Sequence, residues 1–148
     1  MKIKSIAIAC DHAGYTLKNK IIEHLKSLGI EKIKDFGTYS SESSDYPDNA
    51  HPLAEAVETD EFEIGISLCG SGNGINMTVN KHQGIRSALC WSVEISELAR
   101  AHNDANICSL PARFVDDKLA IEIVDKFLTT GFDGGRHQRR IDKIPITK

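Results

Sequence analysis

Short apolar runs and amphipathic stretches alternate along almost the whole chain of 148 residues. Apolar runs of four to eight residues are typical of buried strands, whereas apolar residues that recur every three or four positions are typical of helices. Their alternation predicts βαβ units, which build a mostly parallel sheet covered by helices. The pattern therefore indicates an α/β fold.

The individual elements follow from the same pattern. Strands are expected at 6–9, 32–36, 64–68, 85–90 and 107–110, and helices at 17–28, around Leu53, and at 75–81, 93–101 and 116–128. Gly29 ends the first helix, and Pro52 suits the first turn of the second. The length is that of one domain, so we expect residues 1–148 to form a single unit. Residues 131–148 show no obvious core face.

Charge and cysteine usage exclude several classes of protein. With 18 basic and 21 acidic residues the net charge is -3, which gives no overall attraction to nucleic acid or to a membrane surface. A long apolar segment and a signal sequence are both missing, which predicts a cytoplasmic protein. Four widely spaced cysteines fit neither a zinc site nor a disulfide scaffold, so we expect reduced thiols. They are Cys10, Cys69, Cys90 and Cys108.

Loops that follow the strands are the place to search for a site, because ligands of parallel sheets bind at the carboxyl ends of the strands. Three such loops carry reactive groups, namely 10–12, 69–74 and 111–113. We expect all three to open on one side of the sheet.

The loop Cys69-Gly70-Ser71-Gly72-Asn73-Gly74 joins a thiol to a glycine-rich turn that can aim several backbone N–H groups at one anion. It lacks the Gly-Lys-Ser/Thr of nucleotide phosphate loops, the glycine spacing of dinucleotide sites and the arginine of cysteine phosphatases. A thiolate beside such donors is suited to remove a proton next to a carbonyl, although a covalent thioester is not excluded. The alternatives are that Cys69 is a buried apolar residue and that Ser71 only caps a helix.

Acid-base and anion-binding groups stand elsewhere in the chain. Asp11 and His12 offer a carboxylate and an imidazole directly after the first strand, although Asp11 can instead cap the first helix. His102 ends the fourth helix, where a purely structural role competes with a catalytic one. Arg136 and Arg140 share a face if a helical turn follows Gly134-Gly135, and Arg113 adds a third guanidinium suited to a phosphate. A basic nucleic-acid tail is disfavoured by the net charge and the few aromatic residues.

The combination resembles the ribose-5-phosphate isomerase B family, which includes the galactose-6-phosphate isomerase subunits, over residues 6–140. The residues that carry the resemblance are Cys10-Asp11-His12-Ala13-Gly14, Gly37-Thr38, Asp45-Tyr46-Pro47, Cys69 to Gly74, Asn80-Lys81, Gly84-Ile85-Arg86, His102-Asn103-Asp104-Ala105-Asn106 and Gly134-Gly135-Arg136-His137-Gln138. Their order and spacing are specific. The resemblance implies a three-layer αβα sandwich with a five-stranded parallel sheet, and no metal or organic cofactor. It also implies a homodimer, sometimes paired into tetramers, whose active sites lie at the subunit interface and receive residues 131–148 of the neighbouring subunit.

For activity the resemblance implies interconversion of ribose 5-phosphate and ribulose 5-phosphate through an enediolate, a step of the non-oxidative pentose phosphate pathway. Cys69 matches the base, and Gly70, Gly72, Asn73 and Gly74 belong to the loop matching the anion hole. Asp11 and His102 match the groups that open the sugar ring, with Ser71 assisting. The phosphate clamp is matched by His12, Arg113, Arg136 and Arg140, and the sugar-hydroxyl contacts by Tyr46 and Asn103.

Two departures bear on these roles. Many relatives carry threonine at the position of Ser71, and some carry serine at the position of Cys69. Ser71 retains the hydroxyl group of threonine. Cys69 places this chain with the cysteine-containing members of the family. A six-carbon substrate such as allose or galactose 6-phosphate would use the same chemistry. A non-catalytic sugar-phosphate sensor and a nucleotide-dependent oxidoreductase are the alternatives from other classes, and the failed glycine fingerprint weighs against the latter.

Overall fold

A computed structural model describes residues 2–146 of the chain. Its strands are β1 Ser5–Cys10, β2 Lys32–Asp35, β3 Ile64–Cys69, β4 Ser87–Leu89 and β5 Ile107–Pro111. Its helices are α1 Tyr15–Ser27, α2 Tyr46–Glu58, α3 Asn73–Val79, α4 Val93–Asn103, α5 Asp117–Thr129 and α6 Arg136–Ile141, with a short 3-10 helix at His12–Gly14. The predicted alternation of strands and helices is confirmed, with boundaries shifted by a few residues.

All four strand pairings are parallel, and the strand order is β2-β1-β3-β5-β4. Cys10 is the partner of Leu68, and Cys69 is the partner of Pro111. The three central strands β1, β3 and β5 therefore end at the same edge of the sheet. This confirms the expected five-stranded parallel α/β fold.

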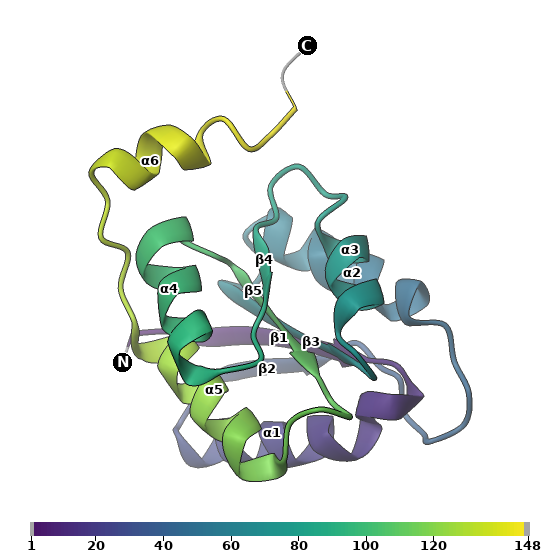
Figure 1. Cartoon of the computed structure of the whole chain (residues 1–148). Coiled ribbons are helices and arrows are strands. Elements are labelled where there is room, and N and C mark those ends of the chain that lie inside the picture. Colours follow the sequence, from purple (N-terminus) through teal and green to yellow (C-terminus); the bar gives the residue numbers. More distant parts are fainter. Residues whose placement is uncertain (1, 147–148) are drawn as a thin grey trace.

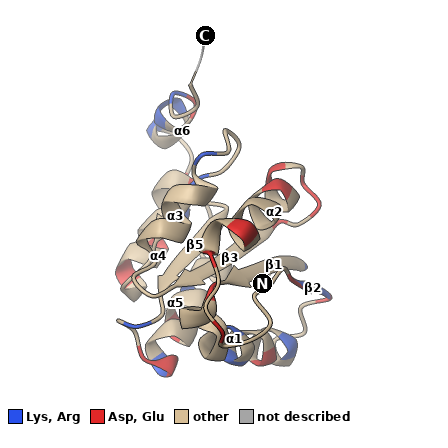
Figure 2. Cartoon of the chain, turned by 90° about the vertical axis from the view of Figure 1, so that its right-hand side faces the viewer, with Lys and Arg blue, Asp and Glu red and all other residues tan. Residues whose placement is uncertain are grey.

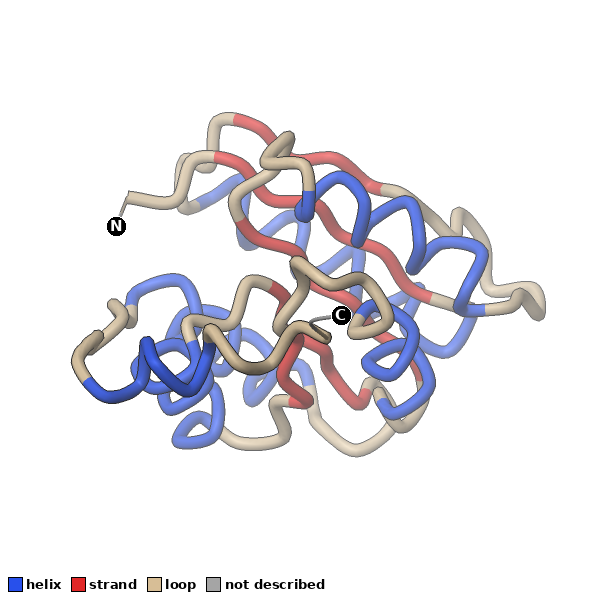
Figure 3. Tube along the Cα trace, turned by 90° about the horizontal axis from the view of Figure 1, so that it is seen from above, coloured by secondary structure: helices blue, strands red, loops and turns tan. Residues whose placement is uncertain are grey.

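Helices cover both faces of the sheet (Figures 1 and 3). Side chains alternate between the faces along a strand, so Ile6 and Ile8 of β1 pack in one core and Ala7 and Ala9 in the other. The first core contains residues of α1, α4 and α5, and the second contains residues of α2 and α3. These layers form the three-layer sandwich.

Two local expectations are wrong. Pro52 does not stand in the first turn of α2, because that helix already begins at Tyr46 and holds Pro47 in its first turn. Pro52 lies inside the helix, where it leaves one backbone carbonyl without its amide donor. The C-terminal segment does bury one apolar side chain, that of Ile141 in α6.

Across residues 2–146, no helix is long and apolar enough to cross a membrane. All four cysteines are free thiols and all are buried. The expectation that they form no disulfide scaffold is confirmed.

Candidate active site

The carboxyl edge of the sheet gathers the three loops singled out in the sequence. The first follows β1 at Asp11, the second follows β3 at Gly70, and the third follows β5 at Ala112. Backbone hydrogen bonds join the second and third loops. The Ala112 amide donates to the carbonyl of Cys69 (2.9 Å), and the Arg113 amide donates to the carbonyl of Gly70 (3.0 Å). The amide of Asp11 donates to the carbonyl of Leu68 (3.1 Å). The three loops therefore lie side by side.

Cys69 is the last residue of β3 and faces the α2 and α3 side of the sheet. It packs in the second core with 4% of its surface exposed. Arg113 lies over the next residue, because a Cβ on Gly70 would come within 3.1 Å of an Arg113 guanidinium nitrogen. A side chain at Gly70 would push this guanidinium away, so the glycine lets the cation lie beside the loop that starts at the thiol.

The turn after Cys69 leaves backbone donors available. Gly72 adopts a left-handed conformation (φ 75°), which glycine reaches without a steric penalty. Ser71 accepts a hydrogen bond from the amide of Asn73 (3.2 Å), so its hydroxyl does cap the start of α3. The Ser71 hydrogen stays free to donate, and the amides of Ser71 and Gly72 have no acceptor among residues 2–146. The capping alternative and the ligand-binding alternative for Ser71 are therefore compatible.

Tyr46 joins the start of α2 to the glycine loop. A Cβ on Gly74 would lie 2.7 Å from the Tyr46 hydroxyl oxygen, so the aromatic ring rests directly on the loop backbone. A cavity of about 480 Å³ opens beside Tyr46 and is also lined by Asp11 and His12. Cavities of this size hold small-molecule ligands.

Asp11 and His12 are each held by a hydrogen bond. The Asp11 carboxylate accepts from the amide of Ala13 (2.9 Å), so the capping alternative is correct, with the cap on the 3-10 helix instead of α1. Nδ1 of His12 lies 3.1 Å from the Ser44 amide, from which it can accept, and 3.3 Å from the Ser44 carbonyl, to which it donates in the other tautomer. A neutral imidazole that accepts at Nδ1 carries its proton on Nε2. His12 can therefore present an N–H donor to the cavity.

The predicted site residues of α4 and α6 lie at the opposite, amino edge of the sheet. His102 and Asn103 end α4, and the Asn103 carbonyl accepts from Arg86, which directly precedes β4 (3.0 Å). The imidazole of His102 stacks on that of His137 in α6, with ring centroids 4.3 Å apart and planes inclined by 13°. Figure 1 shows α6 beyond the end of α4, away from the tip of the β5 arrow.

The helix α6 presents a cationic surface. The helical turn that the sequence analysis set as a condition is present, so Arg136 and Arg140, four positions apart and exposed, share a face. Figure 2 shows basic residues gathered on this helix. Partial burial, His102 and Arg136 all lower the pKa of His137, which favours the neutral imidazole. Nothing in the sequence pattern indicated the pairing of His102 with His137.

The chain thus holds the candidate residues in two groups. The carboxyl-edge group comprises Asp11, His12, Tyr46, Cys69, Gly70, Ser71, Gly72, Asn73, Gly74 and Arg113, and the amino-edge group comprises His102, Asn103, Arg136 and Arg140. One chain does not bring the two groups together, because they lie at opposite ends of the parallel strands.

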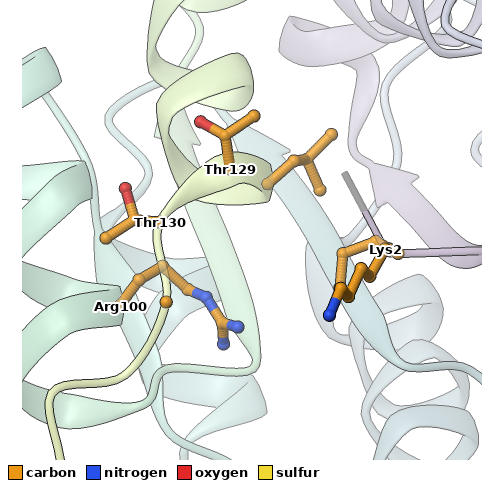
Figure 4. A pocket seen from close by; sticks show the side chains of 7 residues that line it. Lys2, Arg100, Thr129 and Thr130 are labelled. Atoms are coloured by element: carbon orange, nitrogen blue, oxygen red, sulfur yellow. The ribbon is translucent and has the colours of Figure 1, made fainter.

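A second cavity of about 370 Å³ lies apart from the carboxyl-edge group, between Lys2 and the end of α5 (Figure 4). Its polar side chains are largely engaged within the fold. Thr129 and Thr130 donate to carbonyls of α5, and Arg100 donates to the carbonyl of Ala105. Burial lowers the pKa of Arg100. This cavity contains none of the predicted site residues.

A parallel sheet with a thiol, a glycine loop and an arginine at its carboxyl edge is typical of an α/β enzyme with a small anionic substrate. Comparison with known proteins agrees. A family model described as Ribose/Galactose Isomerase matches residues 6–144. Ribose-5-phosphate isomerase B of Escherichia coli is 44% identical over 142 residues, covering 96% of this chain and 95% of that protein.

Solved structures give the same result. A ribose 5-phosphate isomerase from Thermotoga maritima aligns with a TM-score of 0.94 and 48% identity, over 98% of this chain and 99% of that one. Ribose-5-phosphate isomerase B from Mycoplasma genitalium, with bound ribulose-5-phosphate, aligns with a TM-score of 0.90 and 46% identity, over 95% and 93%. The chain belongs to the ribose/galactose isomerase family.

Proposed function

We propose that this protein interconverts ribose 5-phosphate and ribulose 5-phosphate through an enediolate, with Cys69 as the base. The family membership supports the reaction class, and the relative solved with ribulose-5-phosphate supports the five-carbon substrate. The observation that carries the mechanism is the position of Cys69 at the end of β3, directly before a turn whose Ser71 and Gly72 amides have no acceptor in the described part of the chain.

In the proposed reaction the Cys69 thiolate removes the proton from C2 of the open-chain aldose. Electrons then shift to the carbonyl oxygen, and the free amides of the turn stabilise the negative charge that develops there. Return of the proton to C1, together with transfer of the C2 hydroxyl proton to the C1 oxygen, gives the ketose. Asp11 and His102 assist the earlier opening of the sugar ring, the Ser71 hydroxyl donates to a substrate oxygen, and Tyr46 and Asn103 contact the sugar hydroxyls.

The substrate phosphate binds away from the glycine turn in this proposal. Nε2 of His12 donates to it, and Arg113 approaches from the β5 loop. Arg136 and Arg140 complete the clamp, because guanidinium groups form strong charge-assisted bonds to phosphate oxygens.

A second copy of the chain supplies the amino-edge group, so each active site is formed by two subunits of a homodimer. The separation of the two groups within one chain supports this arrangement. Large apolar side chains suited to an interface are exposed, among them Met77 (65%) and Trp91 (58%). The C-terminal segment 131–148 reaches the partner, and its last two residues lie outside the described part. We also propose that dimers can pair into tetramers. The protein is proposed to be cytoplasmic, a location that suits its free thiols.

The mechanism is tested by exchange of the C2 proton of ribose 5-phosphate with solvent deuterium. Cys69→Ala should still bind the sugar phosphate but lose this exchange together with isomerisation. Cys10→Ala is the matched control, because Cys10 is also a buried thiol at a strand end and is expected to keep both activities. Full exchange in Cys69→Ala would show that another group is the base.

A six-carbon aldose phosphate is the second candidate substrate, because the matching family model covers galactose as well as ribose isomerases. Such a sugar needs only a slightly longer pocket and the same proton transfer. Steady-state kcat/KM for ribose 5-phosphate, allose 6-phosphate and galactose 6-phosphate decides between the two. If tight sugar-phosphate binding is found without turnover of any of these, the protein is a sensor.

A further inference from the structure

Three potential metal ligands meet where α6 packs on α4. They are His102, Asp133 and His137, and one ligand atom of each lies within 4.8 Å of the other two. His102 and His137 are half-buried, and Asp133 is exposed. Two imidazoles and a carboxylate are a ligand set that Zn²⁺ accepts, with a fourth position left for water.

A backbone hydrogen bond holds Asp133 next to His102. The Asp133 amide donates to the carbonyl of Ala101 (2.9 Å), which fixes the segment before α6 against the last turn of α4. His137 follows in the first turn of α6, and its ring already stacks on His102. His102 thus lies at the end of α4. Asp133 and His137 lie in the segment that also carries Arg136 and Arg140.

Zinc binding requires a small contraction of this cluster. Tetrahedral bonds of about 2.1 Å place the ligand atoms about 3.4 Å apart, so the most distant pair must approach and the stacked rings must turn toward each other. The Asp133 carboxylate is exposed and the His137 imidazole is half-buried, so both side chains have room to change rotamer. Arg136 and Arg140 lie close to His137 and oppose a cation, which keeps the affinity moderate.

We propose that His102, Asp133 and His137 form a Zn²⁺ site that fastens α6 to the end of α4. Bound zinc occupies a nitrogen of His102. If the proposed function is correct, zinc therefore inhibits the isomerase, because it withdraws His102 from ring opening and restrains the segment that carries Arg136 and Arg140. The inhibition rests on the proposed function, whereas the metal site itself does not.

The test is calorimetric titration of the metal-free full-length protein with ZnCl₂. The wild type is expected to bind one zinc ion per chain, and His137→Gln and Asp133→Asn are each expected to weaken binding about tenfold or more. His51→Gln is the matched control. His51 belongs to a second histidine pair, in which its Nδ1 lies 2.8 Å from Nε2 of His82, and this variant should bind zinc as the wild type does.

Each other outcome overturns the proposal. Unchanged binding in His137→Gln would assign the zinc to a thiol or to another histidine, and loss of binding in His51→Gln would assign it to that second pair. Unchanged binding in Asp133→Asn would exclude the three-ligand site, and no binding to the wild type would exclude any site. Zinc inhibition of ribose 5-phosphate isomerisation, relieved in His137→Gln, is the second readout, and a protein without this activity would leave the calorimetric result valid.

Discussion

Cys69 and His102 lie at opposite edges of one parallel sheet. Cys69 ends β3, whereas His102 precedes β5 by a few residues at the end of α4. A parallel sheet fixes this separation, because every strand runs in the same direction and each covering helix returns the chain to the starting edge. The base and the ring-opening histidine of the proposed mechanism must therefore come from different subunits.

The packing of Tyr46 on Gly74 makes the glycine loop sensitive to a single methyl group. Gly74→Ala should displace the Tyr46 ring, reduce kcat/KM and cost about 1–3 kcal/mol of stability through overpacking. Gly131→Ala is the control, because a Cβ at that position meets no atom within 4 Å. Steady-state kinetics and urea unfolding measure both effects. Equal behaviour of the two variants would contradict the proposed role of this contact.

The arginines of α6 are expected to act on substrate binding. Arg136→Ala and Arg140→Ala should each raise KM for ribose 5-phosphate by about ten- to a hundredfold, the range expected for a lost hydrogen bond to a charged group. Arg139→Ala removes the same charge from the same helix and should change KM much less. A similar rise in all three variants would mean that net charge, and not a defined clamp, attracts the phosphate.

Burial of the Cys10 thiol predicts a specific loss of stability in alkali. Burial raises the pKa of Cys10 from 9.0 to about 11, so the folded protein holds this proton where the unfolded chain has released it. The contribution of the protonated thiol is complete below pH 9 and is lost as the pH rises toward 11. The stability difference between wild type and Cys10→Ala should therefore change in favour of the variant over this interval. Urea unfolding at several pH values measures it, and a constant difference would contradict the raised pKa.

The sequence was sufficient to predict the α/β class, the five strands and the three loops at the carboxyl edge. The spacing of apolar residues and the positions of turn residues are local signals that can be read along the chain. The error at Pro52 has a physical cause. Two prolines lie near the start of α2, and local rules do not show that Pro47 is the one in the first turn. A helical turn after Gly135 was only a condition for placing Arg136 and Arg140 on one face, and the burial of Ile141 depends on packing that distant residues provide.

The sequence identified the candidate residues by their chemistry, but it did not predict the contacts that they make. Loop composition indicated a thiol beside an anion cradle, yet the packing of Tyr46 on Gly74 and the bond from Ser44 to His12 join positions that are far apart in sequence. The stacking of His102 on His137 joins positions still further apart. Contacts of this kind are set by the tertiary fold, and sequence spacing does not reveal them.

In the proposed dimer each active site combines Cys69 of one subunit with His102 of the other, and mixing two inactive variants tests this arrangement. Cys69→Ala and His102→Ala are each expected to be inactive alone. After joint unfolding and refolding, half of the dimers are mixed and each mixed dimer has one intact site, so about a quarter of wild-type activity should return. If the mixture stays inactive although mixed dimers are detected by native mass spectrometry, both residues act within one subunit, and an active site shared between subunits is ruled out.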